Sequence, residues 1–145
     1  MKCLLAALLI PLLYAEIAFG FGEHPEAYCI ERHKKDSDCL VHCKFKHYTF
    51  TDDQYNIKEY HIRNLADFLI KYNVVTANKK NQVEQHLRSC VESSIKRARG
   101  HKSCDSIFYY YTCITDEKLI FFNDYDNAIR RYDQTLRVVT GSRRI

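Results

Sequence analysis

Apolar side chains recur every three or four residues along the middle of the chain, which is the period of an α-helix. One stripe predicts a helix between about Ile57 and Tyr72. A longer stripe predicts a helix that begins near Thr76 or Asn78 and ends at Gly100. The apolar positions of the two stripes are Ile62, Leu65, Phe68, Leu69, Tyr72, Val83, Leu87, Cys90, Val91, Ile95 and Ala98.

Two shorter helices are predicted before these stripes. Pro25 suits the first turn of a helix that ends near Lys34. A second helix carries Cys39 and Cys43 on one face, because they lie four residues apart, so their partners must lie on that side of it. The segment 49–56 is polar and aromatic and predicts a loop. The candidate caps of the second helix are Asp36 and Ser37.

Two further helices are predicted after Gly100. Ser103 can cap the first of them, and the last begins near Asn123 or Asp124. Their apolar positions are Cys104, Ile107, Phe108, Tyr111, Tyr125, Ala128, Ile129, Tyr132 and Leu136. Residues 140–145 form a short basic tail.

Turn residues are scarce in the whole chain, which contains four glycines and two prolines. A β-sandwich or barrel would need many more of them. The pattern therefore predicts a compact all-α domain of about five to six helices.

The first twenty residues predict a signal peptide. Lys2 supplies a positive start, and residues 4–14 are nearly all apolar, but this run is too short to span a membrane. Small residues precede the expected cleavage site before Phe21, with a cut after Gly22 as the close alternative. We expect a secreted, extracellular protein with one domain over residues 21–145 and no transmembrane segment.

Six of the seven cysteines remain once the leader is removed. An even number in a short secreted domain predicts a framework of three disulfides. Each disulfide would add about 2–4 kcal/mol of stability. The six are Cys29, Cys39, Cys43, Cys90, Cys104 and Cys113.

Catalytic and metal-binding patterns are weak. Cys39, His42, Cys43 and His47 have a zinc-like spacing, but a secreted disulfide framework uses both thiols. The chain contains no His-Glu-x-x-His, Gly-x-Ser-x-Gly or glycine-rich phosphate loop. We therefore expect no catalytic residue, no metal and no cofactor, and a protein that is not an enzyme.

Positive charge is concentrated in two segments, although the formal net charge is only +4. Residues 93–104 and residues 134–145 contain no acidic side chain. Such clusters attract polyanions, although cations at a helix end also complement its dipole by about 0.3–1 kcal/mol. The candidate polyanion-binding residues are Lys96, Arg97, Arg99, Lys102, Arg130, Arg131, Arg137, Arg143 and Arg144.

Aromatic residues leave a second function open. Three consecutive tyrosines, 109–111, point around a helix and cannot all line one pocket. Phe121 and Phe122 follow in a connection. These rings can fill the core, or some of them can line a cavity for a small ligand.

The cysteine pattern resembles that of insect odorant-binding proteins, with three residues between the second and third cysteines and eight between the fifth and sixth. Only nine residues separate the first two, fewer than in a typical pheromone carrier. The closer resemblance, over residues 39–139, is to the small odorant-binding-protein-like salivary proteins of blood-feeding sand flies. The blocks that carry it are Cys-Leu-Val-His-Cys-Lys-Phe-Lys-His-Tyr from Cys39, Leu-Ile-Lys-Tyr-Asn-Val-Val from Leu69, His-Leu-Arg-Ser-Cys-Val from His86 and Tyr-Tyr-Thr-Cys-Ile-Thr-Asp from Tyr110.

This resemblance implies an odorant-binding-protein-like fold whose first helix is shortened or absent. It also implies a disulfide pairing, which the number of cysteines alone leaves open. The implied pairs are Cys29–Cys43, Cys39–Cys104 and Cys90–Cys113.

The resemblance further implies a role in saliva. Members of this group bind anionic surfaces and polymers and so block the contact pathway of coagulation. The expected partners are heparin-like glycosaminoglycan, polyphosphate or anionic phospholipid and, indirectly, contact-pathway factors, rather than a specific nucleic acid. The alternative is a carrier or scavenger of a small lipophilic or amine mediator. A third possibility is a paralogue whose anticoagulant role has been lost or replaced.

Overall fold

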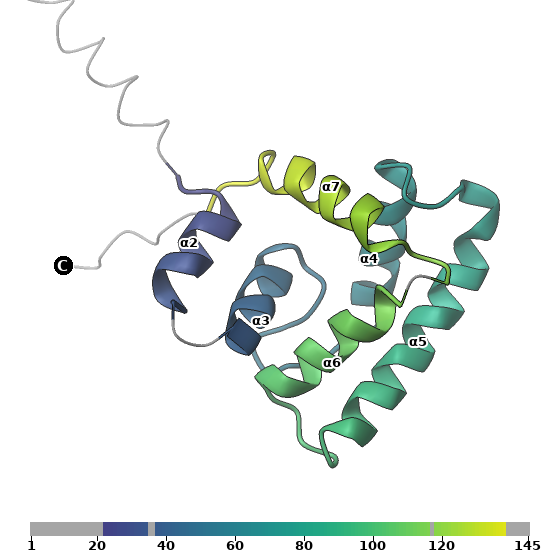
Figure 1. The fold of residues 1–145 in the computed structure, drawn as a ribbon, viewed down its shortest axis with the longest axis horizontal. Helices are drawn as coiled ribbons and strands as arrows, with labels where there is room; N and C mark the ends of the chain where they lie inside the picture. The colour runs from purple at the N-terminus through teal and green to yellow at the C-terminus, as the bar shows by residue number, and fades with distance from the viewer. Residues whose placement is uncertain (1–21, 35–36, 117, 139–145) are drawn as a thin grey trace, which may run out of the picture.

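The computed structural model describes residues 22–34, 37–116 and 118–138, and all regular secondary structure in these ranges is helical. The helices surround a common core (Figure 1), and the predicted all-α class is confirmed. The predicted signal peptide and the tail arginines Arg143 and Arg144 lie outside the described residues. The helices are α2 (Pro25–Arg32), α3 (Ser37–His47), α4 (Glu59–Lys71), the short 3-10 helix η1 (Ala77–Lys79), α5 (Lys80–Arg97), α6 (Cys104–Ile114) and α7 (Phe122–Asp133).

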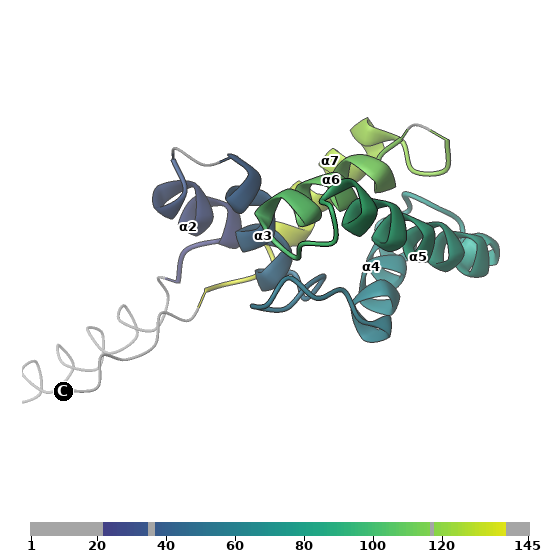
Figure 2. The same cartoon turned by 90° about the horizontal axis from the view of Figure 1, so that it is seen from below.

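Helix α6 links two halves of the domain, because it packs against both α3 and α5. On one side α2 packs against α3, and on the other α4 packs against α5. Figure 2 shows the result, with α2 toward one end of the molecule and α5 toward the opposite end.

Two helices end earlier than the apolar pattern predicts. Helix α5 ends before Gly100, because Arg99 (φ 55°) and Gly100 (φ 82°) both have left-handed backbone angles. The Gly100 N–H donates a 2.9 Å hydrogen bond to the Ile95 carbonyl, which closes the end of the helix. The last helix ends at Asp133, so Leu136 lies beyond it rather than within it.

The core is built mainly from aromatic and branched side chains, and Tyr48, Phe50 and Tyr110 are its largest fully buried residues. Helix α6 turns a slightly different face to this core than predicted. Tyr110 is completely buried, whereas Phe108 and Tyr111, which the pattern placed on the apolar side, are only partly buried. The face is set by packing against α3 and α5 together, which a single-helix pattern does not contain.

The connection before α7 also differs from the core-filling expectation. Phe121 and Phe122 remain 50% and 41% exposed, so these two rings do not fill the core, which was one of the two roles left open for them. Their neighbour Ile120 is fully buried instead. One apolar residue of this connection anchors it, and the two rings project from the start of α7.

Three disulfides connect four of the helices. They join α2 to α3, α3 to α6 and α5 to α6, in the pairs that the family resemblance implies. The bond between α3 and α6 links residues 65 apart in sequence, so by loop-closure entropy it stabilises the fold by about 4 kcal/mol. The pairs are Cys29–Cys43, Cys39–Cys104 and Cys90–Cys113.

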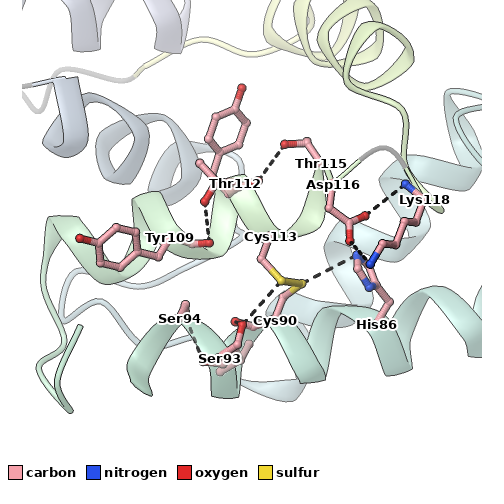
Figure 3. The surroundings of a disulfide bond; sticks show 12 residues. His86, Cys90, Ser93, Ser94, Tyr109, Thr112, Cys113, Thr115, Asp116 and Lys118 are labelled. Carbon is pink, nitrogen blue, oxygen red and sulfur yellow. Dashed lines mark hydrogen bonds and ion pairs between the residues drawn. A yellow bond between two sulfur atoms is a disulfide. The ribbon is translucent and has the colours of Figure 1, made fainter. Parts of the chain in front are cut away.

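Figure 3 shows the bond between α5 and α6 in its surroundings. His86 Nε2 lies 3.8 Å from the Cys90 sulfur, and the Ser93 hydroxyl lies 3.6 Å from the Cys113 sulfur. His86 and Ser93 both lie on α5, so the same helix that provides Cys90 also provides the polar neighbours of the disulfide.

Asp133, at the end of α7, holds the N-terminal segment in place. Its buried carboxylate accepts hydrogen bonds from the Tyr48 hydroxyl (2.7 Å) and the Glu26 backbone N–H (2.9 Å). The Val138 N–H donates to the Glu23 carbonyl at 2.9 Å. Hydrogen bonds to a buried carboxylate are strong, so the short α2 is held by these contacts as well as by its disulfide.

The start of α4 depends on a neutral histidine. His61 Nδ1 accepts the Lys58 backbone N–H at 2.9 Å, so the ring proton is on Nε2. Burial is the main cause that lowers the pKa of His61 below its ordinary value; the charge of Lys58 also lowers it, and that of Asp52 opposes the shift. Protonation would add a charge to a buried ring and remove the acceptor of this cap.

We predict that the protein loses stability as the pH falls below about 6.5, the ordinary pKa of histidine. The unfolded chain takes up a proton there, whereas folded His61 takes it up only at a lower pH. Its contribution to stability is therefore complete above 6.5 and is lost as the pH falls through the folded pKa. His61→Gln keeps an acceptor at this helix position and should give a flatter dependence of Tm on pH.

Thermal unfolding followed by circular dichroism between about pH 7 and pH 5 measures this dependence. The matched control is His101→Gln, because His101 is exposed. Parallel curves for wild type and His61→Gln would contradict the assignment of acid sensitivity to this cap.

Candidate anion-binding site

Four predicted cations lie together between α5 and α6. Lys96 and Arg97 end α5, Arg99 lies in the left-handed turn that follows, and Lys102 lies just before α6. We call residues 96–102 the basic connection. In Figure 1 it lies at the lower edge of the molecule, where α5 and α6 meet.

The charges of the basic connection are not neutralised within the described part of the chain. None of its four cations forms an ion pair with a described acid. The Arg97 guanidinium lies 4.2 Å from the centre of the Tyr109 ring, a cation–π contact that orients the group and keeps its charge. Lys102 Nζ donates to Asn56 Oδ1 at 2.6 Å, and this amide is uncharged.

Several cations elsewhere on the domain differ in this respect. Seven of them have a carboxylate oxygen within 4.0 Å, so their charge is locally offset. These are Lys44, Lys46, Lys58, Lys80, Arg88, Lys118 and Arg130. Other described cations, among them Arg63, Lys71 and Lys79, also lack an ion pair with a described acid, so the basic connection is distinguished by having four such cations within seven residues of chain.

An open, polar hollow of about 400 Å³ lies against the basic connection. Two arginines and one histidine contribute to its wall, and Asp105 is the one acid among its lining residues within the described chain. Positive charge exceeds negative charge in this hollow, which suits a sulfate or phosphate group. The lining residues are Arg97, Ala98, Arg99, His101, Ser103, Asp105 and Tyr109.

The second predicted cluster is engaged in contacts of its own. Arg130 Nε donates to the Asp126 carboxylate at 2.8 Å. Arg131 donates to the Tyr72 carbonyl at 3.0 Å, just beyond the end of α4. Arg137 donates to backbone carbonyls of its own segment, at 3.0 and 2.8 Å. These arginines stabilise helix and chain ends.

The fold does not bring the basic connection together with the described arginines of the second cluster. In Figure 1, α7 lies along the upper edge of the molecule, and the basic connection lies at the lower edge. The helices of the core separate them. A binding face built from the basic connection therefore includes none of the described α7 arginines.

Sequence reasoning missed Asn56 and Lys58, which the fold places near Lys102. All three line one further hollow, next to the basic connection. Asn56 and Lys102 are 46 residues apart in sequence, and no local pattern marks either as a partner of the other. Only the docking of the 55–58 segment onto α5 and α6 reveals the group.

The zinc-like residues have other roles. Cys39 and Cys43 both form disulfides, and His42 Nε2 donates to the Asp52 carbonyl at 3.0 Å. His47 lies close to the Cys29–Cys43 bond, whose sulfur atoms are joined to each other. Among the described helices, none combines the length and apolar character needed to cross a membrane.

Little space for a small apolar ligand is left in the core of the described domain. An aromatic cleft of about 100 Å³ lies between α3, α6 and α7. The centre of the core is filled, and Tyr110 lies there with its hydroxyl buried and without a hydrogen-bond partner among the described residues. The cleft residues are Leu40, Val41, Lys44, Phe45, Tyr48, Tyr111, Tyr125, Asp126 and Ile129.

Comparison with known proteins identifies the family. The model of the PBP/GOBP family matches residues 27–117. Ayaconin of Lutzomyia ayacuchensis is 43% identical over 116 residues, which cover 79% of this chain and 80% of that protein. Salivary protein 15a of Phlebotomus duboscqi is 35% identical over 123 residues, covering 81% of this chain and 87% of the relative. Salivary protein 15b of the same sand fly is 34% identical with the same coverage. The chain therefore belongs to the PBP/GOBP family and is similar over most of its length to salivary proteins of sand flies.

Proposed function

We propose that this protein is a secreted, non-enzymatic salivary protein that binds anionic polymers or surfaces and thereby blocks contact activation of coagulation. The observation that supports this most is the basic connection, whose four cations have no ion pair with a described acid. Cations that are not neutralised internally are available to sulfate and phosphate groups.

The arrangement of the connection favours a flexible, repetitive anion over a single shaped ligand. Its hollow is open and polar, so an anion there stays partly hydrated and bridges several cations. Arg97 is held by Tyr109, so less side-chain entropy is lost when its guanidinium binds. Asp105 weakens the field on one side of the hollow, which directs the polymer toward the α5 cations.

The mechanism is occupation of a surface. Contact-pathway zymogens assemble and activate on anionic material, and a bound basic protein covers that material. Inhibition by this route is stoichiometric and needs no catalytic residue. It depends on salt, because each contact releases counterions from the polymer.

A second candidate is a carrier of a small lipophilic or amine mediator, and the aromatic cleft favours it. Tyr111 and Tyr125 line this cleft together with Asp126, whose carboxylate is already paired with Arg130. Its volume of about 100 Å³ is below the roughly 300–1,000 Å³ typical of ligand pockets. We therefore rank this function second.

We predict that heparin binds with a log–log salt slope of about −3, since each of four cations contributes about −0.7 to −0.9 by analogy with nucleic acids. Replacing three of the cations (Lys96→Gln, Arg97→Gln and Arg99→Asn) should reduce the slope by about 2 and weaken binding. Asparagine is chosen at position 99 because it tolerates the left-handed backbone there.

The control variant removes the same amount of charge elsewhere. Arg63→Gln, Lys71→Gln and Lys79→Gln change exposed cations of α4 and η1. Heparin affinity measured by calorimetry at several salt concentrations should change little in this control. Equal losses in both triple variants would show that only net charge matters, and would contradict a defined site.

We predict that wild-type protein prolongs clotting started by an anionic surface and leaves clotting started by tissue factor unchanged. The Lys96, Arg97 and Arg99 triple variant should lose this effect, because it no longer covers the surface. Equal activity of wild type and variant in the surface-triggered assay would contradict the role of the basic connection.

We predict that calorimetry with biogenic amines and with neutral fatty alcohols shows no saturable binding at micromolar concentration, because the core is filled and the aromatic cleft is small. Loss of binding in Asp126→Asn, if an amine does bind, would locate it in the cleft. One saturable amine site of micromolar affinity would place the carrier function above the proposed one.

A further inference from the structure

A second hollow, of about 330 Å³, lies between α5, α6 and the segment 55–58. We call it the α5–α6 pocket. Its volume is at the lower end of the range for small-molecule sites. It shares only Lys102 with the basic connection. Its lining residues are Tyr55, Asn56, Ile57, Lys58, Val91, Ser94, Ile95, Lys102, Ser106 and Ile107.

The inner wall of the pocket offers no unsatisfied hydroxyl donor to a ligand. Ile107, Ser94 and Ser106 are buried there. The Ser94 hydroxyl donates to the Val91 carbonyl at 2.8 Å, and the Ser106 hydroxyl donates to the Ser103 carbonyl at 2.7 Å. Because both hydroxyls already have partners, an apolar group can cover this wall without leaving a donor unsatisfied.

The mouth of the pocket is positive. Lys102 has no acidic partner in the described chain and donates to the neutral amide of Asn56 at 2.6 Å. Lys58 lies 3.4 Å from a carboxylate oxygen of Asp52. Burial raises the pKa of Asp52, but hydrogen bonds from Asn56, Gln54 and Lys58 outweigh this and lower it to about 2. Asp52 is thus charged at physiological pH and offsets Lys58, which leaves Lys102 as the uncompensated charge.

From this juxtaposition we infer that the α5–α6 pocket binds small organic anions in which one sulfonate, sulfate or carboxylate group is attached to a compact apolar body. The apolar body lies against Val91, Ile95 and Ile107, and the anionic group meets Lys102. A neutral ligand of the same shape would cover part of Lys102 without replacing its lost hydration, so it binds less well. A purely polar anion gains nothing from the apolar wall.

Two fluorescent dyes with the same ring system test this inference. Anilinonaphthalene sulfonate carries one sulfonate, and phenylnaphthylamine lacks it. We expect the sulfonate dye to bind at least about tenfold more tightly, the size of effect of one charge-assisted contact. Equal affinities for the two dyes would overturn the inference, because the positive mouth would then play no part.

Three variants assign the binding to this pocket. Lys102→Ala, at an exposed position that leaves the core intact, should weaken sulfonate-dye binding about tenfold. Lys96→Ala removes an equal charge from the basic connection outside the pocket and should change it by less than about twofold. Ile95→Trp fills the pocket and should abolish dye binding. Dye affinity that is unchanged in Lys102→Ala would overturn the inference, even if Ile95→Trp fails to fold.

The same variants separate this inference from the proposed function. Lys96→Ala should weaken heparin binding and leave the sulfonate dye bound. Folded Ile95→Trp should abolish dye binding and leave heparin binding unchanged. If no form of the protein binds heparin but the sulfonate dye binds more tightly than the neutral dye, the results support the pocket and contradict the polymer site. If the variants change heparin binding as expected but do not change dye binding as expected, the results support the polymer site and contradict the pocket.

Discussion

The two disulfides of α6 constrain the part of the molecule on which the proposed function depends. Cys104, the first residue of α6, is bonded to α3, and Cys113, near its other end, is bonded to α5. An eleven-residue helix attached at both ends cannot shift along its neighbours. The short connection from α5 is therefore fixed at its α6 end by Cys104, the other disulfide joins the two helices that it connects, and four cations are held close together on it. The mutual repulsion of these cations destabilises the turn. The disulfides of the flanking helices limit how far the turn can unfold. The same two bonds set the spacing of α5 and α6, and hence the α5–α6 pocket.

The other end of the molecule uses charge differently. Asp133 is buried and accepts hydrogen bonds from Tyr48 and the backbone of Glu26, which fastens the short first helix. Arg130 pairs with Asp126, and Arg131 and Arg137 donate to backbone carbonyls. Helix α2 buries little apolar surface of its own, so these contacts contribute to holding it in place. Cations that look alike in the sequence thus serve stability at α7, whereas at the end of α5 they remain available to a partner.

Helical period, scarce glycine and proline, and cysteine spacing were enough to predict the class and order of the helices, because each is a local property. What could not be predicted depends on contacts between distant segments. Arg99 adopts a left-handed angle that ends α5 early, and nothing in its side chain indicates this. Phe121 and Phe122 look like core residues, but Ile120 takes the buried position. Lys102 was named as a cation from the charge run, yet its contact with Asn56 and its place beside Lys58 require the folded chain. The separation of the basic connection from Arg130, Arg131 and Arg137 likewise follows from topology, which neither segment of sequence contains.

The central claim is that anionic polymers bind at the basic connection and not at Arg130 and Arg131 of α7 or at Arg137, which follows that helix. The most direct test is a heteronuclear NMR titration of the isotope-labelled protein with a short heparin-derived oligosaccharide. The account predicts that the largest shift changes occur in residues 96–105, with small changes at Arg130, Arg131 and Arg137. Changes concentrated at those three arginines, or spread evenly over every exposed cation, would contradict it.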